Sequence, residues 1–192
     1  MSADSIYPGQ QVRPFAEVPA LRERAVDLLR TPHALMQLTP PEAASVVAHM
    51  QLLSYARGAT LFREGDAAGD HMLLLLEGEV AIDTAGGGPG QPVTVSVVGP
   101  GSVLGEMAVL DGAPRSASCL AMTPVQAAGL HRRDLARLID TEPRAAAKLL
   151  LGLGARTADR LRALGEQLQI YADIVEAKQA EIDRLRGDKR QP

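Results

Sequence analysis

The stretch GSVLGEMAVLDGAPRSAS, residues 101–118, sets the carboxylate of Glu106 and the guanidinium of Arg115 in a run of mostly small and apolar residues. Residues after Gly105 are expected to begin a short helix, and the unpaired N–H groups of a helix start attract an anion. The guanidinium of Arg115 can hold two phosphate oxygens in its planar fork, while Ser116 adds a hydroxyl group. The stretch therefore predicts a turn that binds a phosphate.

The carboxylate of Glu106 needs a different partner, because it is an acceptor and a phosphate offers it no proton. At that range a nucleotide offers the 2′-OH of its ribose. The backbone N–H groups of Ser116 and Ala117 add donors for the phosphate. An alternative is that Glu106 and Arg115 form a salt bridge left over from a ligand-binding ancestor. Small residues that let a ligand approach the backbone are Gly105, Ala108, Gly112, Ala113 and Ala117.

The sequence around this stretch, residues 54–130, is typical of strands. Short apolar runs are separated by Gly, Asp and Pro at close spacing, which indicates an antiparallel β jelly roll. The segment AGGGPG, residues 85–90, is expected to be a hairpin loop, and it lacks the Lys and Ser/Thr of a phosphate-binding P-loop. The strand-like runs are ATLF, HMLLLL, EVAIDT, VTVSVV and VQAAGL.

Helices are expected on both sides of these strands, which makes the fold class α+β. An amphipathic helix is predicted within EVPALRERAVDLLR, residues 17–30, as part of an N-terminal helical extension over residues 1–37. A second helix is predicted to start at Thr39, which precedes two prolines and Glu42. The domain itself is expected to span residues 38–148, with its strands and flanking helices.

A long C-terminal helix with a dimerisation segment is expected over residues 149–187. Apolar residues recur there at alternating spacings of three and four, as in a heptad repeat, which favours a parallel two-stranded coiled coil. The alternative is that this stripe packs onto its own domain. In the heptad assignment, Glu181 at g reaches Arg186 at e of a partner helix. The a positions are Leu161, Leu168, Val175 and Ile182, and the d positions are Leu164, Tyr171, Lys178 and Leu185.

Composition excludes several classes of protein. The net charge of −3 and the pI near 5.8 give no basic surface for DNA or anionic lipid, and the short basic tail is diluted by aspartates. No apolar run reaches the ~20 residues of a membrane-spanning helix, and the N-terminus lacks the pattern of a signal peptide. With the single Cys119 unable to close an intrachain disulfide, we expect a cytoplasmic protein.

Catalytic and metal chemistry are not expected. Cys119 has no adjacent base and is predicted to be a core thiol. Metal-dependent enzymes of the cupin type need clustered histidines, whereas the four histidines here include no H-x-H pair and are predicted to be isolated. These residues are His33, His49, His71 and His131.

The sequence G-E-M-A followed by P-R-S-A-S resembles the phosphate-binding cassette of cyclic nucleotide-binding domains, and the segment at residues 61–82 is similar to the one that precedes the cassette there. The resemblance covers about residues 38–165. It implies that Glu106 takes the ribose hydroxyl, that Arg115 clamps the cyclic phosphate, and that the long helix lids the base. The ligand-binding residues it implies are Gly105, Glu106, Met107, Ala108, Arg115, Ser116, Ala117, Arg156, Arg160 and Leu161.

The sequence departs from the catabolite-activator-like members of that family after the long helix. Those members carry a winged helix-turn-helix there, whereas residues 171–192 read YADIVEAKQAEIDRLRGDKRQP. The resemblance thus implies a stand-alone, non-enzymatic homodimeric receptor that needs no cofactor, does not bind DNA or membranes, and signals to a protein partner through its C-terminal helix. Its expected ligand is cAMP, with cGMP or cyclic di-GMP as alternatives. A degenerate fold that serves only as a dimeric interaction scaffold is the remaining alternative.

Overall fold

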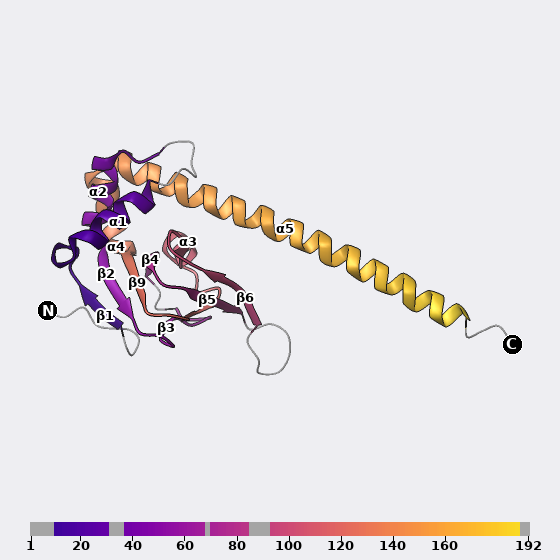
Figure 1. The fold of residues 1–192 in the computed structure, drawn as a ribbon. Helices are drawn as coiled ribbons and strands as arrows, with labels where there is room; N and C mark the ends of the chain where they lie inside the picture. The colour runs from indigo at the N-terminus through magenta and orange to yellow at the C-terminus, as the bar shows by residue number, and fades with distance from the viewer. Residues whose placement is uncertain (1–9, 31–36, 68–69, 85–92, 189–192) are drawn as a thin grey trace.

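Two antiparallel sheets, a group of helices on one side and one long projecting helix make up the computed structural model, which describes residues 10–30, 37–67, 70–84 and 93–188 (Figure 1). The strands are β1 (Gln10–Arg13), β2 (Gln51–Tyr55), β3 (Thr60–Phe62), β4 (His71–Glu77), β5 (Val80–Thr84), β6 (Val93–Val98), β7 (Val103–Leu104), β8 (Ser118–Ala121) and β9 (Val125–His131). The helices are α1 (Pro19–Leu29), α2 (Pro40–Ala48), α3 (Glu106–Asp111), α4 (Arg132–Thr141) and α5 (Pro143–Asp188), with a 3-10 turn at Phe15–Glu17.

The strands are arranged in the orders β1-β2-β9-β4-β7 and β3-β8-β5-β6, and the pairs formed among the described strands are antiparallel. The expectation of antiparallel sheets with flanking helices is confirmed. One difference lies in the N-terminal segment, expected to be helical, because its residues Gln10–Arg13 also pair with β2. The loop predicted at residues 85–90 lies outside the described residues.

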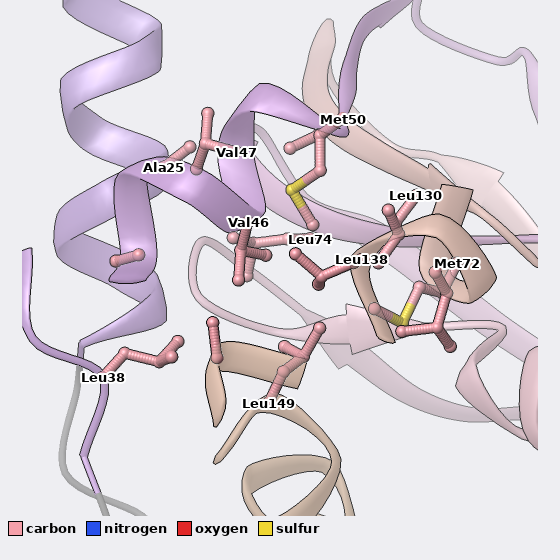
Figure 2. Close-up of a cluster of buried hydrophobic side chains, with 14 of the residues drawn as sticks. Ala25, Leu38, Val46, Val47, Met50, Met72, Leu74, Leu130, Leu138 and Leu149 are labelled. Carbon is pink, nitrogen blue, oxygen red and sulfur yellow. The ribbon is translucent and has the colours of Figure 1, made fainter. Parts of the chain in front are cut away.

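Strand β4 divides two hydrophobic clusters. Successive side chains of a strand point to opposite faces, so Leu73 and Leu75 enter the cluster between the sheets. Met72 and Leu74 instead face the helices, where Figure 2 shows Leu74 near Val46 of α2. The continuous apolar run of β4 is therefore explained by burial on both faces.

Helix α5 begins on this helical cluster and then leaves the body of the protein. It starts at Pro143, earlier than the expected boundary at residue 149, because proline suits the first position of a helix. Leu149 packs into the cluster, and Lys148 donates to Glu42 Oε2 of α2 at 2.5 Å. This hydrogen bond is the largest cause that lowers the pKa of Glu42 to about 2. The contact fixes α5 against α2.

The expected start of α2 is confirmed at Thr39. Its backbone N–H and its Oγ1 both donate to Glu42 Oε2, at 2.8 and 2.9 Å. One carboxylate thus serves the beginning of α2 and the first part of α5, which makes the orientation of the long helix depend on α2.

The distal part of α5 projects away from the sheets (Figure 1). Its apolar stripe is exposed. The alternative that the stripe packs onto its own domain is therefore wrong for the described side chains, whereas the coiled coil stays a prediction. The side chains of Leu185 and Arg186 lie outside the described residues. No helix in the described parts of the chain has the length and apolar character needed to cross a bilayer. The exposed stripe residues, at 42% to 69% exposure, are Leu161, Leu164, Leu168, Tyr171, Val175 and Ile182.

Candidate functional site

The turn between β7 and α3 is built around a glycine. Gly105 has φ 72°, a left-handed conformation that side chains other than glycine rarely adopt. A Cβ atom added to Gly105 would lie 2.2 Å from Nη1 of Arg115, a distance at which one of the two groups must move. Glycine is therefore required both by the backbone and by the arginine beside it.

We expect Gly105→Ala to destabilise the protein by about 1–3 kcal/mol for the left-handed backbone alone, and by more because the new methyl group displaces Arg115. Gly58→Ala is the matched control, since Gly58 has φ 81° and open space around its Cβ position. Urea unfolding of both variants measures the difference. Equal losses of stability in the two variants would contradict the close approach at Gly105.

Arg115 is a buried cation held by backbone carbonyls. Its side chain donates from Nη1 to the Gly105 carbonyl at 2.9 Å and from Nη2 to the His71 carbonyl at 2.7 Å, and the residue is only 4% exposed. Its guanidinium carbon lies 3.7 Å from the centroid of the Phe62 ring. Arginine stays charged when buried, so this arrangement presents a fixed positive charge at the cassette.

A pocket opens in front of this charge. The space outside protein atoms is about 420 Å³, part of it open to solvent. On its wall, Glu106 lies with Oε1 3.8 Å from Nη1 of Arg160, which reaches across from α5. The pocket is lined by Phe62, Ile82, Leu104, Gly105, Glu106, Met107, Ala108, Arg115, Ser116, Ala117, Cys119 and Arg160.

Eight of the ten residues named from the sequence share this pocket, and Arg156 and Leu161 do not line it. Arg156 donates from Nη1 to the Gly101 carbonyl at 2.7 Å, and burial lowers its pKa. Leu161 is 64% exposed. Of the two arginines expected on the lid helix, only Arg160 therefore faces the site, where it meets Glu106, while Arg156 ties α5 to the loop before β7.

Sequence reasoning missed the apolar wall of the pocket. Phe62 ends β3, Ile82 lies in β5 and Cys119 lies in β8, and these strands are neighbours in one sheet. Burial raises the pKa of the Cys119 thiol to about 12, consistent with the predicted core thiol. The alternating pattern of the strands was the available signal, but it does not say which strands are neighbours.

The prediction that the histidines are isolated is wrong for two of them. His71 and His131 are paired in the register of β4 and β9, and their ring centroids are 5.2 Å apart beside Asp70. Burial, followed by the charge of Arg115, lowers the pKa of His71 to about 4. No sequence pattern indicated this group, because strand pairing brings its members together.

The chain is similar in sequence to known proteins. The cyclic AMP receptor protein of Thermus thermophilus is 35% identical over 124 residues, which are 64% of this chain and 56% of that protein. The CRP-like cAMP-activated global transcriptional regulator of Mycobacterium tuberculosis is 29% identical over 137 residues, 70% of this chain and 58% of that protein. The chain thus spans somewhat more than half of these curated relatives.

The fold is also that of a solved structure, a cyclic nucleotide-binding domain from Methylobacillus flagellatus. The two superimpose with a TM-score of 0.76 at 29% identity, covering 85% of this chain and 90% of that one. Residues 52–142, which contain the cassette and its apolar wall, match the family model of the cyclic nucleotide-binding domain. Through these residues the chain belongs to the cyclic nucleotide-binding domain family.

Proposed function

We propose that this protein is a non-enzymatic receptor for a cyclic nucleoside monophosphate, with cAMP as the first candidate. One observation carries the proposal: the buried Arg115 and the acceptor Glu106 lie on the wall of one pocket with an apolar side. A cyclic nucleotide offers a singly charged phosphate, a ribose hydroxyl and a flat base in one small molecule. The pocket has a chemically matching group for each of these parts.

The charge of the pocket supports an anionic ligand. The guanidinium groups of Arg115 and Arg160 bring two positive charges and Glu106 brings one negative charge, which leaves one positive charge in excess. A cyclic phosphate with one negative charge would balance this excess. The proposed receptor uses no catalytic group and no cofactor.

The choice of cAMP rests on what the relatives are named for, because the two curated relatives are a cyclic AMP receptor and a cAMP-activated regulator. Titration calorimetry of the purified chain with cAMP, cGMP and cyclic di-GMP tests it. We expect saturable binding of one cAMP per chain and weaker binding of the others. Tighter binding of cGMP or cyclic di-GMP would mean that this nucleotide, and not cAMP, is the ligand. Binding of none of the three would favour the scaffold alternative.

Glu106 is proposed to accept a hydrogen bond from the ribose 2′-OH. A 2′-deoxy cyclic nucleotide should then bind the wild type more weakly by ~1.5–3 kcal/mol, which is typical of a hydrogen bond to a charged group. This difference should shrink in Glu106→Gln, which keeps the shape of the side chain. Calorimetry with both ligands and both proteins measures it. An equal loss in the two proteins would mean that Glu106 does not contact the ribose.

Signalling is proposed to run through α5, because Arg160 lies in the pocket and on the helix that carries the exposed stripe. A ligand can change the position of α5 only if it binds one position of the helix more tightly than another. Typical couplings of ~1–3 kcal/mol between two sites correspond to roughly 5- to 150-fold changes in partner affinity. We expect cyclic nucleotide to change hydrogen exchange along residues 150–185. Identical protection in a protein shown to bind ligand would break the link between pocket and helix.

The output is proposed to be a homodimer that contacts a protein partner through α5, with no role in DNA binding. The described helix continues unbroken from Pro143 to Asp188, so this segment contains no helix-turn-helix. Its exposed stripe follows the heptad spacing of a parallel coiled coil. A second copy of the chain would bury that stripe.

A further inference from the structure

Two histidines meet in the larger sheet where β4 begins and β9 ends, next to Arg115 of the cassette. His71 is the first residue of β4, His131 is the last residue of β9, and the two are direct partners in the antiparallel register. Directly paired residues present their side chains on the same face of a sheet. The residue before β4, Asp70, adds a carboxylate, and its own carbonyl accepts a hydrogen bond from the backbone N–H of Arg132 at 2.7 Å.

The distances among the three side chains suit a metal ion. Asp70 Oδ1 lies 3.1 Å from Nδ1 of His131 and 3.7 Å from Nδ1 of His71, and one ligand atom from each residue falls within 4.8 Å of the others. A tetrahedral ion with bonds of about 2.0–2.1 Å to nitrogen and oxygen holds its ligand atoms about 3.4 Å apart. Small side-chain rotations would therefore close the group around one ion.

The burial of His71 is a separate observation that points to a ligand. The residue is 3% exposed, and neither of its ring nitrogens has a hydrogen-bond partner among the described residues. A buried polar group left without a partner is costly in a folded protein. A metal ion between His71 and Asp70 would give one of these nitrogens a bond, and the neutral imidazole that burial favours is the form that binds metals.

The group is open to solvent and includes one carboxylate. The side chains of His131 and Asp70 are 18% and 54% exposed, so an ion can reach the group from solvent and keep a water molecule as a further ligand. The carboxylate of Asp70 supplies negative charge, while the nearby guanidinium of Arg115 opposes a cation. Two imidazoles and one carboxylate form a ligand set typical of zinc sites that keep one position for water.

We propose that Asp70, His71 and His131 bind one divalent transition-metal ion of the Zn²⁺ class. The ion joins the start of β4 to the end of β9. The ion would also help to position Arg115, because the main-chain carbonyl of His71 accepts a hydrogen bond from Arg115 Nη2. The Phe62 ring contacts both side chains, with its centroid 3.7 Å from the Arg115 guanidinium carbon and 5.3 Å from the His71 ring.

The test is a metal titration of the full chain, without an affinity tag and freed from metal by a chelator. Competition with a chromophoric chelator measures Zn²⁺ binding, and Co²⁺ reports the ligand geometry through its visible absorption. We expect one Zn²⁺ per chain and a rise in melting temperature on binding. His131→Ala and Asp70→Asn should each weaken binding by at least about 10-fold and abolish the Co²⁺ absorption of a four-coordinate site.

The matched control is His49→Ala, since His49 lies on α2's C-terminal end and its ring contacts the Ser45 carbonyl instead of this group. It should bind Zn²⁺ as the wild type does. Asp70→Asn keeps the main-chain carbonyl and the side-chain shape, so circular dichroism should show a folded variant. Absence of stoichiometric Zn²⁺ binding by the wild type would overturn the proposal, as would affinities of His131→Ala and Asp70→Asn equal to that of the wild type.

Discussion

Arg115→Ala is expected to weaken cyclic nucleotide binding by about 2–5 kcal/mol, at least about 30-fold in affinity. This is the usual cost of removing one partner from a buried, hydrogen-bonded charge pair. Arg115 is only 4% exposed, so water cannot replace its guanidinium easily at the phosphate. Calorimetry with the same nucleotide measures the loss.

Two further variants separate binding from folding. Arg115→Lys should recover part of the affinity, because an ammonium keeps the charge but cannot form the planar fork. Arg24→Ala is the matched control, since Arg24 donates from Nε to the Leu76 carbonyl of β4 at 2.6 Å and does not line the pocket. It should bind nucleotide normally. Unchanged affinity in a folded Arg115→Ala variant would refute the role of Arg115.

Replacing Leu164 and Leu168 with glutamate is expected to convert a dimer into monomers. The two side chains are 42% and 69% exposed in the single chain and occupy the d and a positions of the heptad repeat. Four carboxylates would then face one another in the seam of a two-stranded coiled coil, where apolar side chains are required. Analytical ultracentrifugation, with and without nucleotide, measures the mass.

A matched control places the same two glutamates away from the seam of the coiled coil. Ala163 and Ile170 both occupy c positions, so Ala163→Glu with Ile170→Glu adds the same charge on another face of α5. This control should remain dimeric. A monomeric wild type would contradict the predicted coiled coil. If only the control variant were monomeric, the interface would have to lie on the face of Ile170 instead.

The cassette could be predicted from the sequence because its residues are close together along the chain. Gly105, Glu106, Arg115 and Ser116 belong to one short helix and the turns on either side of it, so their meeting requires only local structure. The buried run of β4 and the start of α2 at Thr39 were also local signals. The strand β4 and the start of α2 after Thr39 are confirmed.

Groups that depend on strand register or helix rotation could not be predicted in this way. His71 and His131 meet only because β4 and β9 pair in one particular register. Arg156 and Arg160 lie one turn apart on α5, and the packing of α5 decides that Arg160 reaches the pocket while Arg156 contacts the Gly101 carbonyl. The pairing of β1 with β2 was missed because the polar sequence QQVR has no apolar alternation.

The most direct test of the nucleotide pocket is a crystal structure of the full chain grown with cAMP. We predict density for the nucleotide in the pocket between α3 and α5, with a cyclic phosphate oxygen within hydrogen-bonding distance of the Arg115 side chain and the 2′-OH on Glu106. A nucleotide bound elsewhere, or bound in this pocket with its phosphate away from Arg115, would contradict the account.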